Sequence, residues 1–167
     1  MSPDRTIWYF AYGSNLDPGT FLGRRRMRPL SSQVARLDHW ALCFDLPVGP
    51  GERGVGNVRQ EPGSLIWGVA YELESTEAAR LDSTEGVHRG AYRRVSIRVR
   101  TASNDALPAF TYQSPRGIPS RKPSRRYLGL LLTGARHHGL PAPWIDRLRA
   151  TPVAIDERDN QLELPIE

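Results

Sequence analysis

Near the N-terminus stands Thr6-Ile7-Trp8-Tyr9-Phe10-Ala11-Tyr12-Gly13-Ser14-Asn15, an aromatic and β-branched run that ends in a glycine turn. Residues of these types are typical of a buried β-strand, and the Gly-Ser-Asn sequence after them is typical of a turn. We therefore predict a first strand over residues 6–12 that stops abruptly at Gly13. Directly after the turn, Asp17 is placed to cap a short helix with Pro18 at its first position.

Four later segments also have strand character. In residues 93–101 the apolar side chains alternate with arginines and a serine, which predicts one inward and one outward face. Large apolar side chains at positions 65, 67, 69, 71 and 73 recur at a spacing of two, so all five are expected on one face of a strand. The remaining predicted strands cover residues 34–44 and 107–113.

Three helices are predicted around these strands. Ser75 is expected to be the N-cap of a short helix that runs to Leu81. A longer helix is predicted from a cap at Ser124 to position 138, because Gly139 follows as a left-handed end. Pro143 is expected to open the last helix. Because the strands are too closely spaced for β-α-β units, we predict an α+β fold, a small closed mixed β-barrel with flanking helices.

Length and composition indicate one globular domain. The chain has 167 residues, of which 39% are hydrophobic and 25% are charged, and both fractions are ordinary for a folded domain. We expect a single domain over residues 1–167 whose acidic tail, residues 153–167, is irregular or mobile. No stretch approaches the ~20 apolar residues that cross a bilayer, and the N-terminus does not resemble a signal peptide. These features favour a cytoplasmic protein without a membrane partner.

Basic residues outnumber acidic ones, with 23 Lys and Arg against 18 Asp and Glu and a formal net charge of +5. The cations gather in residues 24–28 and 116–126. No helix-turn-helix, zinc finger or RNA-binding strand motif accompanies them, so no nucleic-acid partner is expected. Solvated faces commonly carry such runs, while an attraction for small acidic substrates stays open.

Two short segments are candidates for chemistry. Consecutive backbone N–H groups of Gly13-Ser14-Asn15 can bind a carboxylate or an oxyanion, although the same sequence is common in surface turns. Glu85 stands at a helix-to-strand junction directly before Gly86. Partial burial there would raise the pKa of its carboxyl toward the range that a general base needs, whereas a surface loop would leave it an ordinary glutamate. Taken alone, the two segments leave both interpretations open.

Other candidate sites are weaker. The four histidines have no spacing that would assemble a metal site. Ser14 lacks the Gly-x-Ser-x-Gly flanks of a nucleophile elbow, and Cys43 lies in an apolar strand where an inert core thiol is expected. Gly54-Val55-Gly56 lacks the third glycine and the acidic partner of a dinucleotide-binding fingerprint.

Two motifs, in this order, resemble those of the γ-glutamyl cyclotransferase family. Tyr9-Phe10-Ala11-Tyr12-Gly13-Ser14-Asn15-Leu16 is similar to the family's opening strand and signature turn. Leu81-Asp82-x-x-Glu85-Gly86-Val87, followed by Tyr92, is similar to the segment with its catalytic glutamate. With supporting matches at 66–69 and 127–141, the resemblance covers about residues 7–151. It implies the same small closed β-barrel that the strand pattern predicts.

The resemblance also implies roles for individual residues. Glu85 matches the catalytic acid/base of the family. Substrate contacts are implied for the first strand, the turn and one helix residue, namely Tyr9, Phe10, Ala11, Tyr12, Gly13, Ser14, Asn15 and Tyr127. Tyr112 is expected as a further pocket residue.

The implied reaction is the cyclisation of γ-glutamyl amides, which releases 5-oxoproline and the free amine. The substrate's own α-amine is the nucleophile, so the enzyme has to fold the substrate and move protons, and no metal or organic cofactor is expected. The motifs leave open the preferred leaving group and the choice between monomer and homodimer. Two other functions also stay open, a non-catalytic barrel that binds anionic ligands and an amide hydrolase on the same scaffold.

Overall fold

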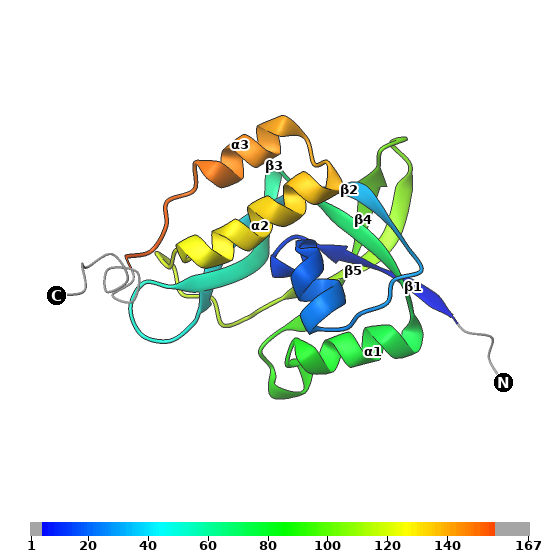
Figure 1. Cartoon of the computed structure of the whole chain (residues 1–167), viewed down its shortest axis with the longest axis horizontal. Coiled ribbons are helices and arrows are strands. Elements are labelled where there is room, and N and C mark those ends of the chain that lie inside the picture. The colour runs from blue at the N-terminus through cyan, green and yellow to red at the C-terminus, as the bar shows by residue number, and fades with distance from the viewer. Residues whose placement is uncertain (1–4, 156–167) are drawn as a thin grey trace.

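The computed structural model describes residues 5–155, which form a closed barrel of five strands with helices around it (Figure 1). The strands are β1 (Thr6–Ala11), β2 (Ser31–Pro47), β3 (Gly54–Glu74), β4 (Arg93–Thr101) and β5 (Ala106–Gln113). Their order around the barrel is β1-β3-β2-β4-β5. Neighbours are antiparallel except for β1 and β5, which pair in parallel where Tyr9 lies opposite Phe110. The predicted small closed mixed barrel of an α+β fold is therefore confirmed.

Helices cover two sides of this barrel. They are η1 (Ser14–Leu16), η2 (Gly19–Arg24), α1 (Ser75–Thr84), η3 (Val87–Arg89), α2 (Arg125–His138) and α3 (Ala142–Arg149). Figure 1 shows α2 and α3 on one side and α1 on the other, with the blue η1–η2 segment between them. The glycine turn and η1 follow directly from β1, and η1 contacts α2. The turn therefore lies between the end of β1 and α2.

Aromatic packing anchors β1 at the centre of the core. Phe10 has no exposed surface, and the Tyr9 ring stacks on Tyr71 of β3 and Phe110 of β5 with centroid distances of 6.3 and 5.4 Å. Large aromatic side chains contribute strongly to core stability because each buries much apolar area. The predicted first strand is confirmed, and it ends at Ala11, one residue earlier than expected.

The five apolar residues predicted on one face of a strand over 65–73 lie at alternate positions of β3, but they differ in burial. Leu65 is exposed and Trp67 is half-buried, whereas Ile66 between them is fully buried. Farther along β3, all four residues in the range 68–71 are buried. An alternating pattern identifies the inner face only where one side of a strand meets solvent, and here both sides are covered. In β4 the predicted alternation is confirmed, with Ile97 and Val99 buried between exposed arginines.

The start and end of α1 differ from the prediction. Its N-cap is Glu74, which makes no side-chain capping bond, while the Ser75 hydroxyl donates to the Arg5 carbonyl at 2.6 Å. The helix continues to Thr84, so that Glu85 is its C-cap and Gly86 reverses the chain with a φ of 70°. The extra turn of helix places the Glu85 side chain at the end of α1.

The remaining predicted helix signals agree with the structure. Asp17 accepts hydrogen bonds from the Thr20 N–H at 3.0 Å and the Thr20 hydroxyl at 2.9 Å in the first turn of η2, whose N-cap position is Pro18. Trp144 and Leu148 share the buried face of α3. After Pro152 the described residues 153–155 have no regular secondary structure. The rest of the predicted tail lies outside the described residues.

The described tail residues are nevertheless attached to the domain. The N–H of Ala154, which is buried, donates to the Pro123 carbonyl at 2.8 Å, and the Ile155 N–H donates to the Glu52 carboxylate at 3.1 Å.

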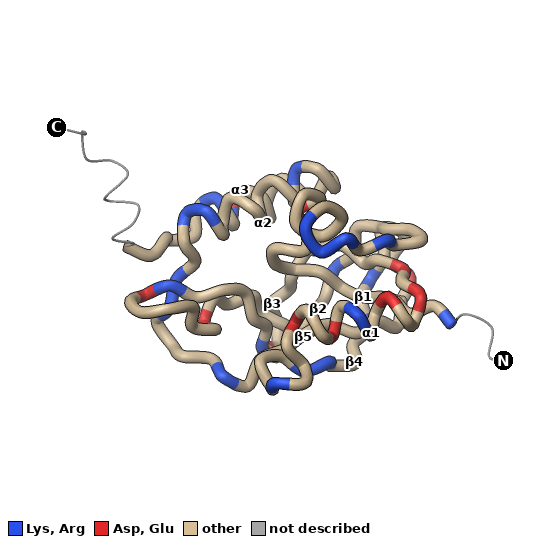
Figure 2. The backbone as a smooth tube through the Cα atoms, turned by 60° about the horizontal axis from the view of Figure 1, so that its bottom comes forward, with Lys and Arg blue, Asp and Glu red and all other residues tan. Residues whose placement is uncertain are grey.

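No helix within residues 5–155 is long and apolar enough to cross a membrane. Figure 2 shows the Lys and Arg positions on several separate segments of the backbone.

The serine cap of α2 gives a direct stability prediction. The Ser124 hydroxyl oxygen accepts the Tyr127 N–H at 3.0 Å, and Gly139 ends the helix with a φ of 72°. Ser124→Ala should lower the free energy of unfolding by about 1 kcal/mol, because this N–H loses its acceptor. Urea denaturation measures the change, with Ser103→Ala at an exposed position as the control. Equal losses in the two variants would contradict the role of the cap.

Candidate active site

A small pocket lies at the end of β1, where the glycine turn begins. Its lining residues come from several elements and are Tyr9, Tyr12, Gly13, Ser14, Asn15, Gly56, Glu85, Tyr92, Tyr112 and Tyr127. Every residue that the resemblance assigns to the site is among them except Phe10 and Ala11, which are fully buried in β1. Because successive side chains of a strand point to opposite faces, Tyr9 faces the pocket and Phe10 packs elsewhere.

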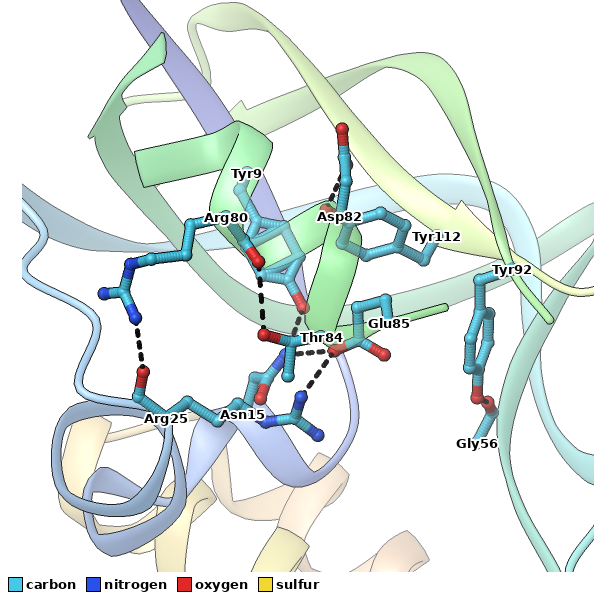
Figure 3. Close-up of polar contacts among 10 residues, drawn as sticks. All are labelled: Tyr9, Asn15, Arg25, Gly56, Arg80, Asp82, Thr84, Glu85, Tyr92 and Tyr112. Carbon is cyan, nitrogen blue, oxygen red and sulfur yellow. Dashed lines mark hydrogen bonds and ion pairs between the residues drawn. The ribbon is translucent and has the colours of Figure 1, made fainter. Parts of the chain in front are cut away.

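Glu85 is the acidic residue of this pocket, and its side chain is only 13% exposed. One carboxylate oxygen, Oε1, accepts a hydrogen bond from Asn15 Nδ2 at 3.0 Å and lies 3.4 Å from Arg25 Nη1. Figure 3 shows Asn15 and Arg25 approaching the carboxylate from the same side, with Tyr92 lying beside it. The signature turn and the glutamate motif, 70 residues apart, therefore meet in one hydrogen bond.

The surroundings of Glu85 act on the pKa of its carboxyl in two opposite directions. Burial raises the pKa of the Glu85 carboxyl above its ordinary value, while the Arg25 guanidinium and the Asn15 hydrogen bond act in the opposite direction. Of the two interpretations left open for Glu85 from the sequence, partial burial and a surface loop, the structure shows burial. Glu85 is thus a carboxyl with a raised pKa that has a hydrogen-bond donor, a nearby cation and little contact with solvent.

Arg25 was not expected in the site, because the run of arginines around it was interpreted as a solvated face. Its backbone is held in place by Arg80 of α1, which donates to the Arg25 carbonyl at 3.1 Å (Figure 3). Arg80 also donates to the Arg26 carbonyl at 2.6 Å. Glu77 pairs with Arg80 at 2.8 Å and thereby orients it. One helix, α1, thus fixes both the carboxylate at its end and the segment with the facing guanidinium.

Tyr127 and Tyr92 also line the pocket, and both form hydrogen bonds with Gly56. The Gly56 N–H donates to the Tyr127 hydroxyl at 2.9 Å, and the Tyr92 hydroxyl donates to the Gly56 carbonyl at 2.7 Å. A Cβ at Gly13 or at Gly56 would lie 2.8 Å from the Tyr127 hydroxyl oxygen. Both glycines are therefore required by close approach, and Gly56 belongs to the segment that was discarded as a dinucleotide motif.

The signature turn is supported from outside the pocket by Tyr71 and His138. The Tyr71 hydroxyl donates to the Asn15 carbonyl at 3.0 Å, and His138 Nε2 lies 3.0 Å from the Leu16 carbonyl oxygen and 3.1 Å from the Tyr71 hydroxyl. Burial lowers the pKa of His138, so the neutral ring is favoured. The sequence spacing of the histidines gave no indication of this contact with the turn.

Asp82 is a further residue whose role sequence reasoning missed. It belongs to the glutamate motif but was assigned no role from the sequence, and its Oδ1 accepts hydrogen bonds from the Tyr112 hydroxyl at 2.6 Å and Arg94 Nε at 2.8 Å. The Tyr112 carbonyl in turn accepts the Tyr12 hydroxyl at 2.6 Å. These bonds link α1, β4, β5 and the turn, and they hold the predicted pocket residue Tyr112 in place.

Metal and thiol chemistry have little support in the described residues. Residues 5–155 contain no group of three or more His, Cys, Asp or Glu side chains that could hold a metal ion. Cys43 is half-buried in β2, and burial raises the pKa of its thiol to about 12. A thiol with this pKa is almost wholly protonated near neutral pH and is a poor nucleophile.

Comparison with known proteins identifies the family. A model of the AIG2-like family matches residues 65–148, a span that includes Glu85 and Tyr127. The gamma-glutamylcyclotransferase of Mus musculus is 33% identical over 152 residues, which cover 87% of this chain and 78% of the mouse protein. The human enzyme of the same name is 30% identical over 154 residues, or 88% and 79% of the two chains. The chain belongs to the γ-glutamyl cyclotransferase family.

A solved structure supports the same family assignment. A γ-glutamyl cyclotransferase of known structure, 26% identical in sequence, superposes with a TM-score of 0.78 and covers 95% of this chain and 98% of its own. The resemblance drawn from the two motifs is confirmed, and the chain is an enzyme of the γ-glutamyl cyclotransferase type. The signature turn lies before the span of the family model, whereas the glutamate motif lies inside it.

Proposed function

We propose that this chain cyclises the γ-glutamyl group of γ-glutamyl amino acids or amines and releases 5-oxoproline, with Glu85 as the general acid/base. The supporting observation is the Glu85 carboxylate, which is nearly buried, has a raised pKa and is hydrogen-bonded to the signature turn. Among the described residues that line the pocket it is the sole carboxylate. A general base works best when its pKa lies near the operating pH, and burial moves Glu85 in that direction.

The turn and its neighbours would hold the γ-glutamyl half of the substrate. The first N–H groups of a short helix have no partner within the helix, so the start of η1 can present a backbone donor for the α-carboxylate or the developing oxyanion at Asn15, while the Ser14 N–H donates to the Tyr127 hydroxyl. Asn15 Oδ1 is buried without a hydrogen-bond partner in the described part of the chain. The α-ammonium of a substrate would supply the missing donor and would then lie beside Glu85.

Tyr127 is proposed to contact the reacting carbonyl. Burial raises the pKa of its phenol to about 12, so the hydroxyl is protonated at neutral pH. Its oxygen already accepts the Gly56 N–H at 2.9 Å, which leaves the hydroxyl proton to be donated to a substrate oxygen. Tyr9 and Tyr12 complete the pocket walls, and the buried Phe10 and Ala11 support them from within β1.

The proposed steps need no external reactant. Glu85 takes one proton from the α-ammonium, and the freed amine attacks the γ-carbonyl carbon to form the ring C–N bond. The tetrahedral intermediate collapses with cleavage of the original amide C–N bond, and the attacking nitrogen loses a second proton. Both protons end on the departing amine, which leaves as an ammonium. Holding amine and carbonyl at attack distance can supply several kcal/mol of the barrier lowering, roughly 7 or more in favourable cases.

A panel of substrates tests the reaction class. Incubation with γ-glutamyl-alanine, γ-glutamyl-lysine and glutathione should yield 5-oxoproline from at least one of the three. Free glutamate in place of 5-oxoproline would instead indicate an amide hydrolase. Absence of turnover together with salt-dependent binding of nucleic acid would favour a binding module.

Arg25→Gln is expected to move the acid limb of the kcat/KM pH profile to higher pH. Arg25 holds down the pKa of Glu85, and without the cation the carboxyl would stay protonated, and unable to accept a proton, up to higher pH. The pH dependence of 5-oxoproline formation measures the shift. Arg26→Gln, an exposed neighbour with the same change in charge, is the control, and identical profiles for the two variants would contradict the prediction.

A further inference from the structure

A second pocket of about 580 Å³ opens directly outside the active site. It shares Ser14, Glu85, Tyr92 and Tyr127 with the inner pocket, so the two are continuous. If the γ-glutamyl group lies in the inner pocket, as the proposed function requires, the amine that leaves has to extend into this outer pocket. The outer walls should therefore select the leaving group.

The walls of the outer pocket are strongly basic. Arg24, Arg25, Arg53 and Arg126 line it, whereas Glu85 is the sole acidic lining residue in the described part of the chain. Arg25 Nη1 lies 3.4 Å from the Glu85 carboxylate and balances its negative charge. A concave surface with an excess of one sign of charge concentrates its field and favours ligands of the opposite sign.

Two of these arginines are suited to bind a ligand. Arg24 ends η2 and Arg126 lies in the first turn of α2, so they approach the pocket from different elements. Both are exposed, and neither forms an ion pair with an acidic residue within residues 5–155. A guanidinium binds a carboxylate through two parallel hydrogen bonds, so each side chain can accommodate one carboxylate.

We infer that the preferred substrate has a leaving group with two carboxylates, that is, a γ-glutamyl derivative of an acidic amino acid. This inference rests on the proposed function. The leaving group of an ordinary γ-glutamyl amino acid has one carboxylate, which would satisfy only one of the two arginines. An acidic side chain supplies the second anion, and a lysine side chain would add a cation to walls that are already positive.

The decisive comparison is between γ-glutamyl-glutamate and γ-glutamyl-glutamine, which have nearly the same shape and differ in one charge. We expect kcat/KM for γ-glutamyl-glutamate to be higher by about tenfold at low ionic strength, and γ-glutamyl-lysine to be the poorest of the three. Added salt should reduce the preference, because the outer pocket is open to solvent and its charges are screened.

Variants of Arg24 and Arg126 test whether these two side chains provide the preference for the glutamate substrate. Arg126→Gln and Arg24→Gln should each bring the ratio of kcat/KM values for the glutamate and glutamine substrates closer to one. Arg136→Gln removes the same charge at the opposite end of α2 and should leave this ratio unchanged. Because the ratio is taken within one variant, a general loss of folded enzyme cancels.

Two results would overturn the inference. Equal kcat/KM values for γ-glutamyl-glutamate and γ-glutamyl-glutamine in the unmodified enzyme would show that the second charge is not recognised. A preference that Arg126→Gln and Arg24→Gln alter no more than Arg136→Gln does would show that these side chains do not provide it. Absence of 5-oxoproline from every substrate, γ-glutamyl-alanine included, would overturn the proposed function as well, and this result is distinct from the first two.

Discussion

Glu85→Gln should lower kcat/KM for 5-oxoproline formation by about 10²–10⁴-fold, the range typical of the loss of a general acid/base. Glutamine has nearly the same size as glutamate and keeps an oxygen that can accept the hydrogen bond from Asn15 Nδ2. It cannot take a proton from the α-ammonium of the substrate. Timed assays of 5-oxoproline release from one γ-glutamyl substrate measure the loss.

Stability measurements separate this chemical effect from misfolding. Because the pKa of the Glu85 carboxyl is raised in the folded protein, its contribution to stability is full below the unfolded pKa and is lost as pH rises through the folded pKa. The melting temperature of Glu85→Gln relative to the wild type should therefore increase with pH above the ordinary range of a carboxyl. Glu61→Gln, at a partly exposed site on β3 away from the pocket, is the matched control and should retain activity. Turnover by Glu85→Gln at more than about a tenth of the wild-type rate would contradict the role of Glu85.

Gly56→Ala should lower kcat/KM by about 100-fold, although it adds a single methyl group. The new Cβ would lie 2.8 Å from the Tyr127 hydroxyl oxygen and 3.2 Å from the Tyr12 ring. Tyr127 would have to move, and a displacement of about 1 Å at a reacting group is enough for a loss of this size. Steady-state kinetics with a γ-glutamyl substrate measure it.

A double variant shows whether Tyr127 transmits the effect. Tyr127→Phe removes the hydroxyl that clashes, so adding Gly56→Ala to it should cost much less than Gly56→Ala costs in the wild type. Gly129→Ala in α2 is the control, because a Cβ there meets nothing within 4 Å. Equal activity of Gly56→Ala and Gly129→Ala would contradict the predicted loss of kcat/KM. Additive effects in the double variant would show that contact with the Tyr127 hydroxyl does not cause that loss.

Local sequence patterns predicted the elements that have one face toward solvent or a marked end. The alternation of β4 and the cap and glycine end of α2 agree with the structure. In β3 the spacing of two did not indicate which side chains are buried, since Ile66 and not Leu65 is buried and both faces of this strand are covered farther along. Burial on two faces depends on the rest of the fold, so no periodicity within the strand could show it.

The residues of the site fall into the same two groups, those that local motifs predict and those whose positions depend on distant contacts. The turn and Glu85 were predicted because they occur in short motifs, and the structure brings them together through the Asn15–Glu85 hydrogen bond. Arg25 and Gly56 could not be predicted, since the arginine stands in a charged run and the glycine in a loop-like segment. Their places are set by contacts with Arg80 and Tyr127, which are 55 and 71 residues away in the sequence.

Isotope labelling of the product tests the central claim, that the substrate's own amine and not water attacks the γ-carbonyl. In water enriched in ¹⁸O, γ-glutamyl-alanine should give 5-oxoproline without ¹⁸O, because its ring carbonyl oxygen comes from the amide. Mass spectrometry distinguishes this product from glutamate. Free glutamate with one ¹⁸O atom would show attack by water and would contradict the account.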